Sequence, residues 1–306
     1  MEATNGLDPR AGIRSSLRDG VAGLLAGLYM GSRTLLRRGL RSAIPILNLH
    51  RVSSFRPEHS MTLQPETFRA LLAGLQRSYR FVSLRELDRV LASGQSGEAL
   101  CSLTFDDCYG CLYTHAVPIL RALEIPATFF VSSGFVDSAT PFPHDVETGF
   151  LDLPNFTSAQ LRELAHDPLF EIGSHTITHC DFSEPVDPAA IARELAESRS
   201  TLAAITGRPV TRFAVPWGDL PRCRPEVIAA ARAAGYERVY SHFGGRNLIR
   251  ADGRVGYLLQ RICSHGSAAY VRACLEGYRG RASFLPGTTP RDTWPPELHD
   301  TDLRRL

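Results

Sequence analysis

Lysine is absent from the 306-residue chain, and all 34 basic side chains are arginine. This absence excludes Schiff-base chemistry, a lysine general base and the lysine of a phosphate-binding P-loop. The chain also has almost no net charge, because 34 basic residues stand against 32 acidic residues and leave a formal charge of +2. Without a broad positive field, the composition predicts no nucleic-acid partner.

Cysteine is too sparse for a disulfide scaffold. The chain has seven cysteines, an odd number, whereas secreted disulfide scaffolds are shorter and denser in cysteine. No apolar run has the length of a membrane span, and none is followed by a signal-cleavage pattern. We therefore expect a cytoplasmic protein in which most cysteines are small core residues.

The two ends of the chain differ in composition from the middle. Residues 12–41 combine apolar residues at helical spacing with surrounding arginines, so residues 1–41 predict a basic amphipathic helical extension. Such a segment fits either peripheral contact with a membrane surface or a cover over the open end of the main domain. Residues 286–306 are rich in Pro, Thr and Asp and predict a disordered tail. The main domain is therefore expected over residues 42–285.

Within the main domain, short apolar strands alternate with helices of about ten residues. Strands are expected over 44–52, 100–107, 127–131, 170–175, 211–215, 236–240 and 258–262, and helices over 65–76, 112–123, 158–165, 188–206, 225–234 and 268–277. Ser83 is expected to cap a further helix, and Gly207 to end the 188–206 helix. This alternation predicts parallel strands, arranged as a barrel or as a doubly wound sheet.

Three of the predicted strands end in unusual polar groups: Asp106-Asp107, His175 with His179, and Pro216-Trp217-Gly218. The carboxyl ends of parallel strands lie on one face, where sites of α/β folds are built. A carboxylate and two histidines give a three-ligand metal site with open positions, which is typical of a catalytic metal. Alone, each motif also fits a solvated strand end.

These motifs resemble those of the polysaccharide deacetylase family, also called the NodB-homology or carbohydrate esterase family 4 group. Thr104–Asp107 matches its Thr-Phe-Asp-Asp motif, and Ser174–His179 is similar to its paired-histidine motif. Phe213–Gly218 approximates its third motif, an Arg-x-Pro-Tyr-Gly-like segment. The resemblance extends over about residues 44–275.

The resemblance implies a distorted (β/α) barrel of about seven parallel strands that removes an N-acetyl group from an N-acetylated amino sugar. It implies that Asp107, His175 and His179 bind a divalent metal, usually zinc. Asp106 would be the general base on the metal-bound water. The backbone N–H of Trp217 lies where the family stabilises the oxyanion.

The catalytic acid and the arginine that orients the base vary between branches of the family. The segment around His50 resembles the N-terminal motif of the poly-N-acetylglucosamine deacetylases, which implies that His50 is the acid, with His265 as the alternative. Arg261 is the candidate that orients Asp106, and Arg212 is the second candidate.

Two rival functions remain open from the sequence. The family usually has glycine after Asp-Asp, whereas Cys108 follows here and forms a Cys-x-x-Cys pattern with Cys111 that fits a redox protein. The same scaffold also fits hydrolysis of another C–N bond in a small molecule. Cys180, beside His179, fits either a regulatory role or ordinary packing. The 136–158 loop is expected to border the substrate site.

Overall fold

A computed structural model describes residues 43–55, 61–94, 96–107, 109–149, 151, 153–219, 221–242, 247–248, 256–263 and 267–276. The predicted N-terminal extension, the predicted tail, Cys108 and His265 lie outside these described residues. No helix within them is both long and apolar enough to cross a membrane.

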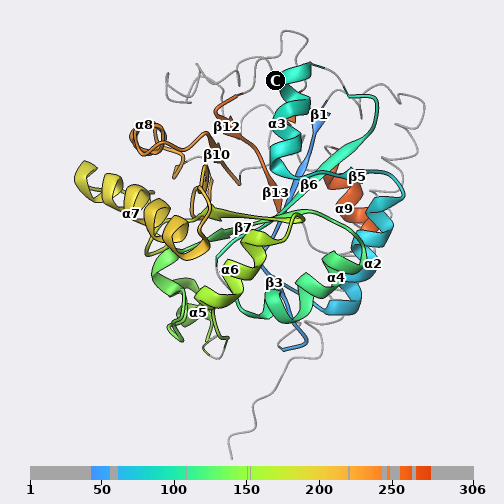
Figure 1. The fold of residues 1–306 in the computed structure, drawn as a ribbon, viewed down its shortest axis with the longest axis horizontal. Coiled ribbons are helices and arrows are strands. Elements are labelled where there is room, and N and C mark those ends of the chain that lie inside the picture. The colour runs from blue at the N-terminus through green and yellow to red at the C-terminus, as the bar shows by residue number, and fades with distance from the viewer. Residues whose placement is uncertain are drawn as a thin grey trace, which may run out of the picture.

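The central sheet consists of parallel strands (Figure 1). In sheet order, the strands are β12 (Leu258–Leu259), β10 (Arg238–Tyr240), β9 (Arg212–Ala214), β8 (Phe170–Ser174), β7 (Ala127–Val131), β6 (Leu100–Phe105), β2 (Ile46–Leu49) and β13 (Ile262–Cys263). Every neighbouring pair along this path is parallel. Short strands flank it: β5 (Arg80–Phe81) on β6, β1 (Ala43–Ile44) with β11 (Asn247–Leu248), and β3 (Arg51–Val52) with β4 (Thr62–Leu63).

The two ends of this sheet belong to one short segment. β12 pairs with β10 and β13 pairs with β2, and only Gln260 and Arg261 separate β12 from β13. Asn247 bridges the interruption, because its amide nitrogen donates to the carbonyl oxygens of Ile44 (3.2 Å) and Gln260 (3.0 Å). The sheet therefore curls until its ends meet, which confirms the predicted distorted barrel of parallel strands.

Helices surround the curled sheet (Figure 1). They are α2 (Pro65–Gln76), α3 (Leu84–Ser93), α4 (Val117–Ala122), α5 (Pro143–Thr148), α6 (Ser158–His166), α7 (Pro188–Thr206), α8 (Pro225–Ala233) and α9 (Ala268–Leu275). The Ser83 hydroxyl accepts the Glu86 N–H at 3.1 Å and caps α3 as predicted. Gly207 ends α7 with φ of 65°, the left-handed conformation that favours glycine.

Three segments differ locally from the sequence prediction. The helix expected over 112–123 starts as a π-helix, η2 (Leu112–Ala116), because hydrophobic spacing does not reveal one extra residue in a turn. The 136–158 segment contains α5, a helix too short for a periodic pattern, which begins at Pro143. The strand expected over 258–262 is split, because Arg261 turns into the barrel and its Nε donates to the Ser241 carbonyl at 2.9 Å.

A small apolar cluster fills the barrel beneath its polar mouth. On β6, Leu100 joins this inner cluster, whereas Cys101 and Leu103 join the larger core outside the sheet. This alternation follows from the two-residue period of a strand. Leu87, with its neighbours on α3, packs against Phe130 and Tyr240 of the inner cluster. Helix α3 thus closes the barrel below the layer that holds Asp106 and Arg261.

We expect Leu87→Ala to lower the free energy of unfolding by about 2–5 kcal/mol, since a buried leucine would leave a cavity in the barrel. Urea denaturation measures this loss. Leu151→Ala is the matched control, because Leu151 is 52% exposed and its truncation should change stability by no more than about 0.5 kcal/mol. Equal losses in the two variants would contradict the assignment of α3 as part of the core.

Candidate metal-dependent active site

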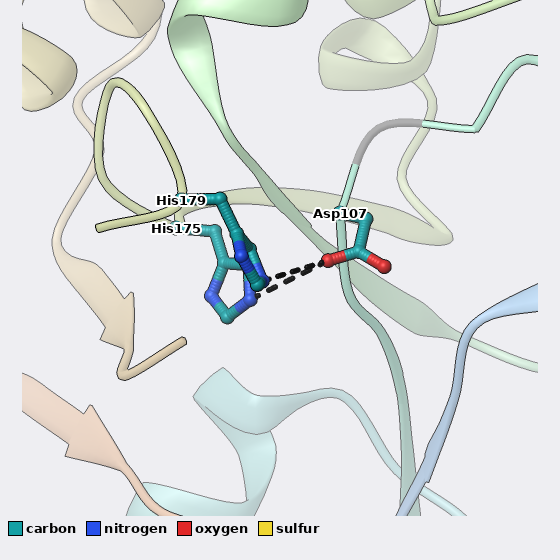
Figure 2. A group of neighbouring side chains, drawn as sticks. All are labelled: Asp107, His175 and His179. Carbon is teal, nitrogen blue, oxygen red and sulfur yellow. Dashed lines mark ion pairs between the residues drawn. The ribbon is translucent and has the colours of Figure 1, made fainter. Parts of the chain in front are cut away.

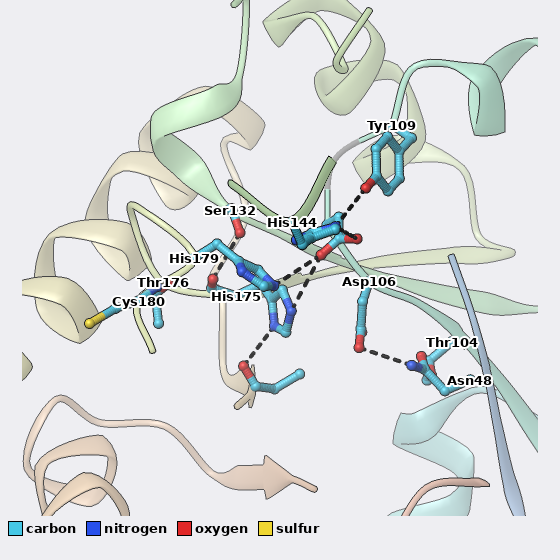
Figure 3. Close-up of polar contacts among 12 residues, drawn as sticks. Asn48, Thr104, Asp106, Tyr109, Ser132, His144, His175, Thr176, His179 and Cys180 are labelled. Atoms are coloured by element: carbon cyan, nitrogen blue, oxygen red, sulfur yellow. Dashed lines mark hydrogen bonds and ion pairs between the residues drawn. The ribbon is translucent and has the colours of Figure 1, made fainter. Parts of the chain in front are cut away.

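The end of β6 carries two adjacent carboxylates, and Figure 3 shows that Asp106 points toward Asn48. The Asp106 N–H donates to the Leu49 carbonyl at 3.1 Å and continues the pairing of β6 with β2. Asp107 then has φ of 75°, a left-handed conformation that is strained for any residue with a Cβ. This turn at Asp107 lets the two side chains meet separate partners.

Asp106 is held by Arg261 and Asn48. Arg261 donates from Nη1 to Oδ1 (2.6 Å) and from Nη2 to Oδ2 (2.8 Å), and the Asn48 amide donates to Oδ2 (2.9 Å). Both Asp106 and Arg261 are buried, and the guanidinium Cζ lies 5.1 Å from the Phe130 ring centroid. Burial raises the pKa of the Asp106 carboxyl, but the charge and hydrogen bonds of Arg261, together with the charges of His175 and His50, outweigh burial and hold this pKa below its usual range. Asp106 is therefore ionised at neutral pH.

The second arginine candidate has other partners. Arg212 donates to Glu171 (3.0 Å), Asp88 (2.7 Å) and the Tyr240 hydroxyl (2.9 Å) beside α3. The structure therefore places Arg261, and not Arg212, on the Asp106 carboxylate. The two arginines look alike in sequence, and only the curling of the sheet brings residue 261 to the end of β6.

Asp107, His175 and His179 converge on one point (Figure 2). Asp107 Oδ1 lies 3.2 Å from His179 Nε2 and 3.7 Å from His175 Nε2, and all three side chains are buried. One possible ligand atom from each residue lies within 4.8 Å of the others. This is the arrangement of three protein ligands around one ion.

The hydrogen bonds of His175 support a cation at this point. Its Nδ1 lies 2.8 Å from the Ala214 carbonyl oxygen, which can only accept, so Nδ1 carries the proton. Burial lowers the pKa of His175 to about 4, so the ring is neutral and Nε2 holds a lone pair. Nε2 and the Asp107 carboxylate are then two acceptors that face each other, which suits a divalent ion between them.

The turn that carries both histidines is strained and is held from α7. Thr176 and His179 have φ of 69° and 58°. The buried Glu194 carboxylate accepts the N–H groups of Ile177 (2.8 Å) and Thr178 (3.0 Å). These bonds supply the fixed surroundings that a strained turn requires.

Trp217 lies in a second strained turn, after β9. Its φ is 54°, and the following Gly218 has φ of 60°. A Cβ on Gly218 would lie 2.8 Å from the His242 nitrogen, so only glycine fits there. The indole meets the His179 ring edge-on at 4.3 Å and the Arg222 guanidinium at 5.0 Å. These contacts make Trp217 a fixed wall of the site.

His50 follows β2 and lies on the other side of the mouth. It is half-buried, its ring centroid is 5.9 Å from that of His242, and its charge lowers the pKa values of Asp106 and Asp107. The sequence reading missed His242, although it also follows a strand, β10, like the other site residues. Burial and the charge of Arg261 lower the pKa of His242 to about 4.

A second missed group lies on α5. His144 Nε2 is 3.0 Å from the Tyr109 hydroxyl and 3.8 Å from Asp107 Oδ2 (Figure 3). Tyr109 donates to Asp145 at 2.6 Å, and Asp145 forms a buried ion pair with Arg51 at 2.6 Å. Thus the 136–158 segment, which was expected to border the site, brings His144 beside a metal-ligand candidate.

Cys111 and Cys180 do not have the properties of redox centres. Burial raises the pKa of Cys111 to about 11, whereas a reactive thiol has a lowered pKa. Burial and the charges of Glu194 and Asp181 likewise raise the pKa of Cys180 to about 11. Both thiols therefore stay protonated, which disfavours the redox reading of the Cys-x-x-Cys pattern.

Comparison with known proteins shows which family this part of the chain matches. Residues 93–239, which contain Asp106, Asp107, His175 and His179, match the family model described as polysaccharide deacetylase. Residues 93–239 therefore form a polysaccharide deacetylase domain. The predicted family is thereby confirmed, and the domain belongs to a family of carbohydrate deacetylases.

Individual relatives cover different parts of the chain. Bacillus subtilis YxkH is 26% identical over 196 residues, which are 63% of this chain and 62% of that protein. The Escherichia coli poly-β-1,6-N-acetyl-D-glucosamine N-deacetylase is 34% identical over 121 residues, which are 38% of this chain and only 18% of that protein. The chain thus spans less than two thirds of the length of either relative.

A solved structure shares the fold of the deacetylase domain. IcaB from Ammonifex degensii has a TM-score of 0.65 and 22% sequence identity, over 77% of this chain and 97% of that chain. This likeness confirms the barrel architecture.

We expect His179→Gln to weaken Zn²⁺ binding by more than about 100-fold, since loss of a ligand should exceed the effect of losing an outer partner. Calorimetric titration of the metal-free protein measures the affinity. His166→Gln on the exposed surface of α6 is the control and should bind Zn²⁺ like the wild type. Unchanged affinity in His179→Gln would exclude this residue as a ligand.

We expect Arg261→Met to lower the free energy of unfolding by about 3–5 kcal/mol near pH 7, because the buried Asp106 charge would lose its partner. In the wild type, the lowered pKa of Asp106 adds stability above the unfolded value of about 3.9, and this contribution is lost as pH falls. Without Arg261, burial alone raises this pKa, so the deficit of the variant should shrink from pH 7 toward pH 4.

Urea denaturation of metal-free protein at several pH values tests this dependence. Arg80→Met is the control, since Arg80 forms exposed ion pairs with Glu86 and Glu98 and its loss should cost less than about 1 kcal/mol. A deficit of Arg261→Met that is independent of pH would show that the arginine does not act through the Asp106 charge.

Proposed function

We propose that this domain hydrolyses the N-acetyl group of N-acetylglucosamine units in a saccharide and releases acetate and the free amine. The observation that carries the proposal is the separation of two adjacent carboxylates, with Asp107 among two histidines and Asp106 on Arg261 and Asn48. One carboxylate is thereby available as a ligand and the other as a base. The family match supports deacetylation of a carbohydrate.

Asp107, His175 and His179 would hold the divalent ion, for which Zn²⁺ is the first candidate because of its preference for histidine and carboxylate ligands. Such an ion would lower the pKa of a bound water molecule from roughly 15.7 toward 7, which would make this water a stronger nucleophile at neutral pH. His175 is oriented for this role by its bond to the Ala214 carbonyl, and the 176–179 turn by Glu194.

Asp106 would accept the proton of the attacking water. Arg261 and Asn48 keep its carboxylate ionised and fix its plane, so that the base is oriented before the substrate arrives. The water oxygen adds to the acetyl carbonyl carbon, and the backbone N–H of Trp217 would donate to the resulting oxyanion. The strained turn at Trp217 fixes the direction of this N–H.

His50 would protonate the amine as the C–N bond breaks. Its position beside His242, where its charge acts on both aspartates, supports a role at the reacting atoms. The amine of an amide leaves poorly unless it is protonated, so an acid at this place is required. The alternative acid, His265, stays a candidate for direct comparison by mutation.

The substrate class rests on the relatives and on the walls of the site. The named relatives include poly-β-1,6-N-acetyl-D-glucosamine deacetylases. We therefore infer that the substrate is an N-acetylated saccharide, in a soluble or lipid-linked form. A cytoplasmic location, with membrane contact through residues 12–41, stays a prediction. Hydrolysis of another C–N bond is the alternative reaction on the same residues.

The deciding experiment measures acetate released from β-1,6-linked and β-1,4-linked N-acetylglucosamine oligomers and from N-formyl and N-acetyl small-molecule amides. We expect release from at least one oligomer, its loss with a chelator and its recovery on addition of Zn²⁺. Asp106→Asn should lower the rate by roughly 100-fold or more while Zn²⁺ affinity is kept, since the base and not a ligand is changed.

Asp137→Asn is the matched control for Asp106→Asn, because Asp137 lies in an exposed turn where its carboxylate accepts the Ser158 N–H. This control should release acetate at the parental rate. His50→Asn should slow release from the amide more than from an aryl acetate, whose leaving group needs no proton. Turnover of the small amides alone would favour the alternative reaction. Full activity in Asp106→Asn would exclude Asp106 as the base.

A further inference from the structure

Arg222 connects the two strained turns that carry His179 and Trp217. Its Nε and Nη2 donate to the two carboxylate oxygens of Asp181 at 2.8 and 2.9 Å, and its Nη1 donates to Asp219 at 2.6 Å. Asp181 lies two residues after His179, and Asp219 lies two residues after Trp217. The same guanidinium covers the Trp217 ring, with Cζ at 5.0 Å from the ring centroid.

Both turns depend on their surroundings for their shape. His179 and Trp217 have φ of 58° and 54°, values that persist only where neighbouring contacts enforce them. Glu194 holds the 176–179 turn from α7, and the His242 N–H holds the other turn by a bond to the Gly218 carbonyl at 2.6 Å. Each of these bonds fixes one turn, whereas Arg222 contacts both.

The contacts of Arg222 are poorly suited to a role in global stability. The Asp181 and Asp219 side chains are 43% and 46% exposed, and ion pairs at such positions contribute little to folding. Arg222 nevertheless fixes the orientation of the two turns relative to each other. Its planar guanidinium forms a bidentate bond to one carboxylate, a bond to a second carboxylate and a contact with the indole ring. Its effect should therefore be local to the two turns.

We propose that Arg222 is a positioning residue that sets the distance and orientation between His179 and Trp217, through Asp181 on one side and the indole on the other. The inference builds on the proposed function, because it couples the candidate metal ligand to the candidate oxyanion donor. Arg222 does not touch the reacting atoms. It acts through the two turns that do.

The test uses the 306-residue chain with Trp294→Phe, so that of its two tryptophans only Trp217 remains. In the metal-free state, Arg222→Ala should shift the fluorescence emission of Trp217, because one face of the ring loses its cover. Calorimetric titration should show Zn²⁺ affinity reduced by roughly 10–100-fold, the range for residues that orient metal ligands. The melting temperature should stay near that of the parent.

Arg224→Ala is the matched control. Arg224 lies on the same segment, but its ion pair is with Glu226 (2.5 Å), in the first turn of α8. It should change neither emission nor Zn²⁺ affinity. Arg222→Lys keeps the charge but cannot bond both aspartates in the same way, so it should restore part of the affinity. Asp181→Asn weakens the bond to the metal-binding turn but leaves the bond to Asp219, and should lower Zn²⁺ affinity with little change in Trp217 emission.

In the deacetylation assay, Arg222→Ala should lower kcat by a similar factor and change KM less. The proposal would be overturned if Arg222→Ala kept the Zn²⁺ affinity and the Trp217 emission of the parent. It would also be overturned if Arg224→Ala changed these two quantities as much as Arg222→Ala does. If Arg222→Ala does not fold, Asp181→Asn decides, and unchanged Zn²⁺ affinity in that variant overturns it. Zn²⁺ affinity and Trp217 fluorescence test the role of Arg222 without any need for activity. A parent protein that releases no acetate would contradict the proposed function but not the role of Arg222.

Discussion

The buried contact between Asp106 and Arg261 is the interaction on which the site depends. A carboxylate and a guanidinium without solvent exposure are costly to desolvate, and the cost is offset here by two short bonds and by Asn48. The same contact lies where the sheet closes, since Arg261 interrupts the segment that joins β12 to β13. Closure of the barrel therefore brings Arg261, which helps to keep the candidate base ionised, next to Asp106.

Adjacent placement of Asp106 and Asp107 gives two carboxylates with different electrostatic roles. The left-handed backbone of Asp107 turns its side chain toward His175 and His179, away from Arg261. A carboxylate paired with arginine would be a weaker metal ligand, because the guanidinium competes for its lone pairs. The turn thus keeps the arginine for the base and leaves Asp107 for a cation.

Strained backbone recurs around the site, at Asp107, Thr176, His179 and Trp217. Each strained residue lies in a loop after a parallel strand, and each loop is bonded to a neighbour: by the Ser132 amide at Asp107, and by Glu194, the His242 amide or Arg222 at the other residues. Rigid strands supply the positions, and these bonds supply the directions of the side chains. The site is therefore a property of several loops together.

The sequence by itself determined the parallel α/β architecture, the family and the triad of Asp107, His175 and His179, because strand periodicity and closely spaced motifs are local properties. It ranked Arg261 before Arg212 as the partner of Asp106 but kept both as candidates, and it did not identify Asn48, His144, His242 or Arg222. Asn48, His144 and His242 are far in sequence from the groups that they meet in the site, and Arg222 is 41 residues from Asp181, so no local pattern marks these contacts. Only the curling of the sheet decided between Arg261 and Arg212, because pairing of β13 with β2 brings residue 261 beside β6.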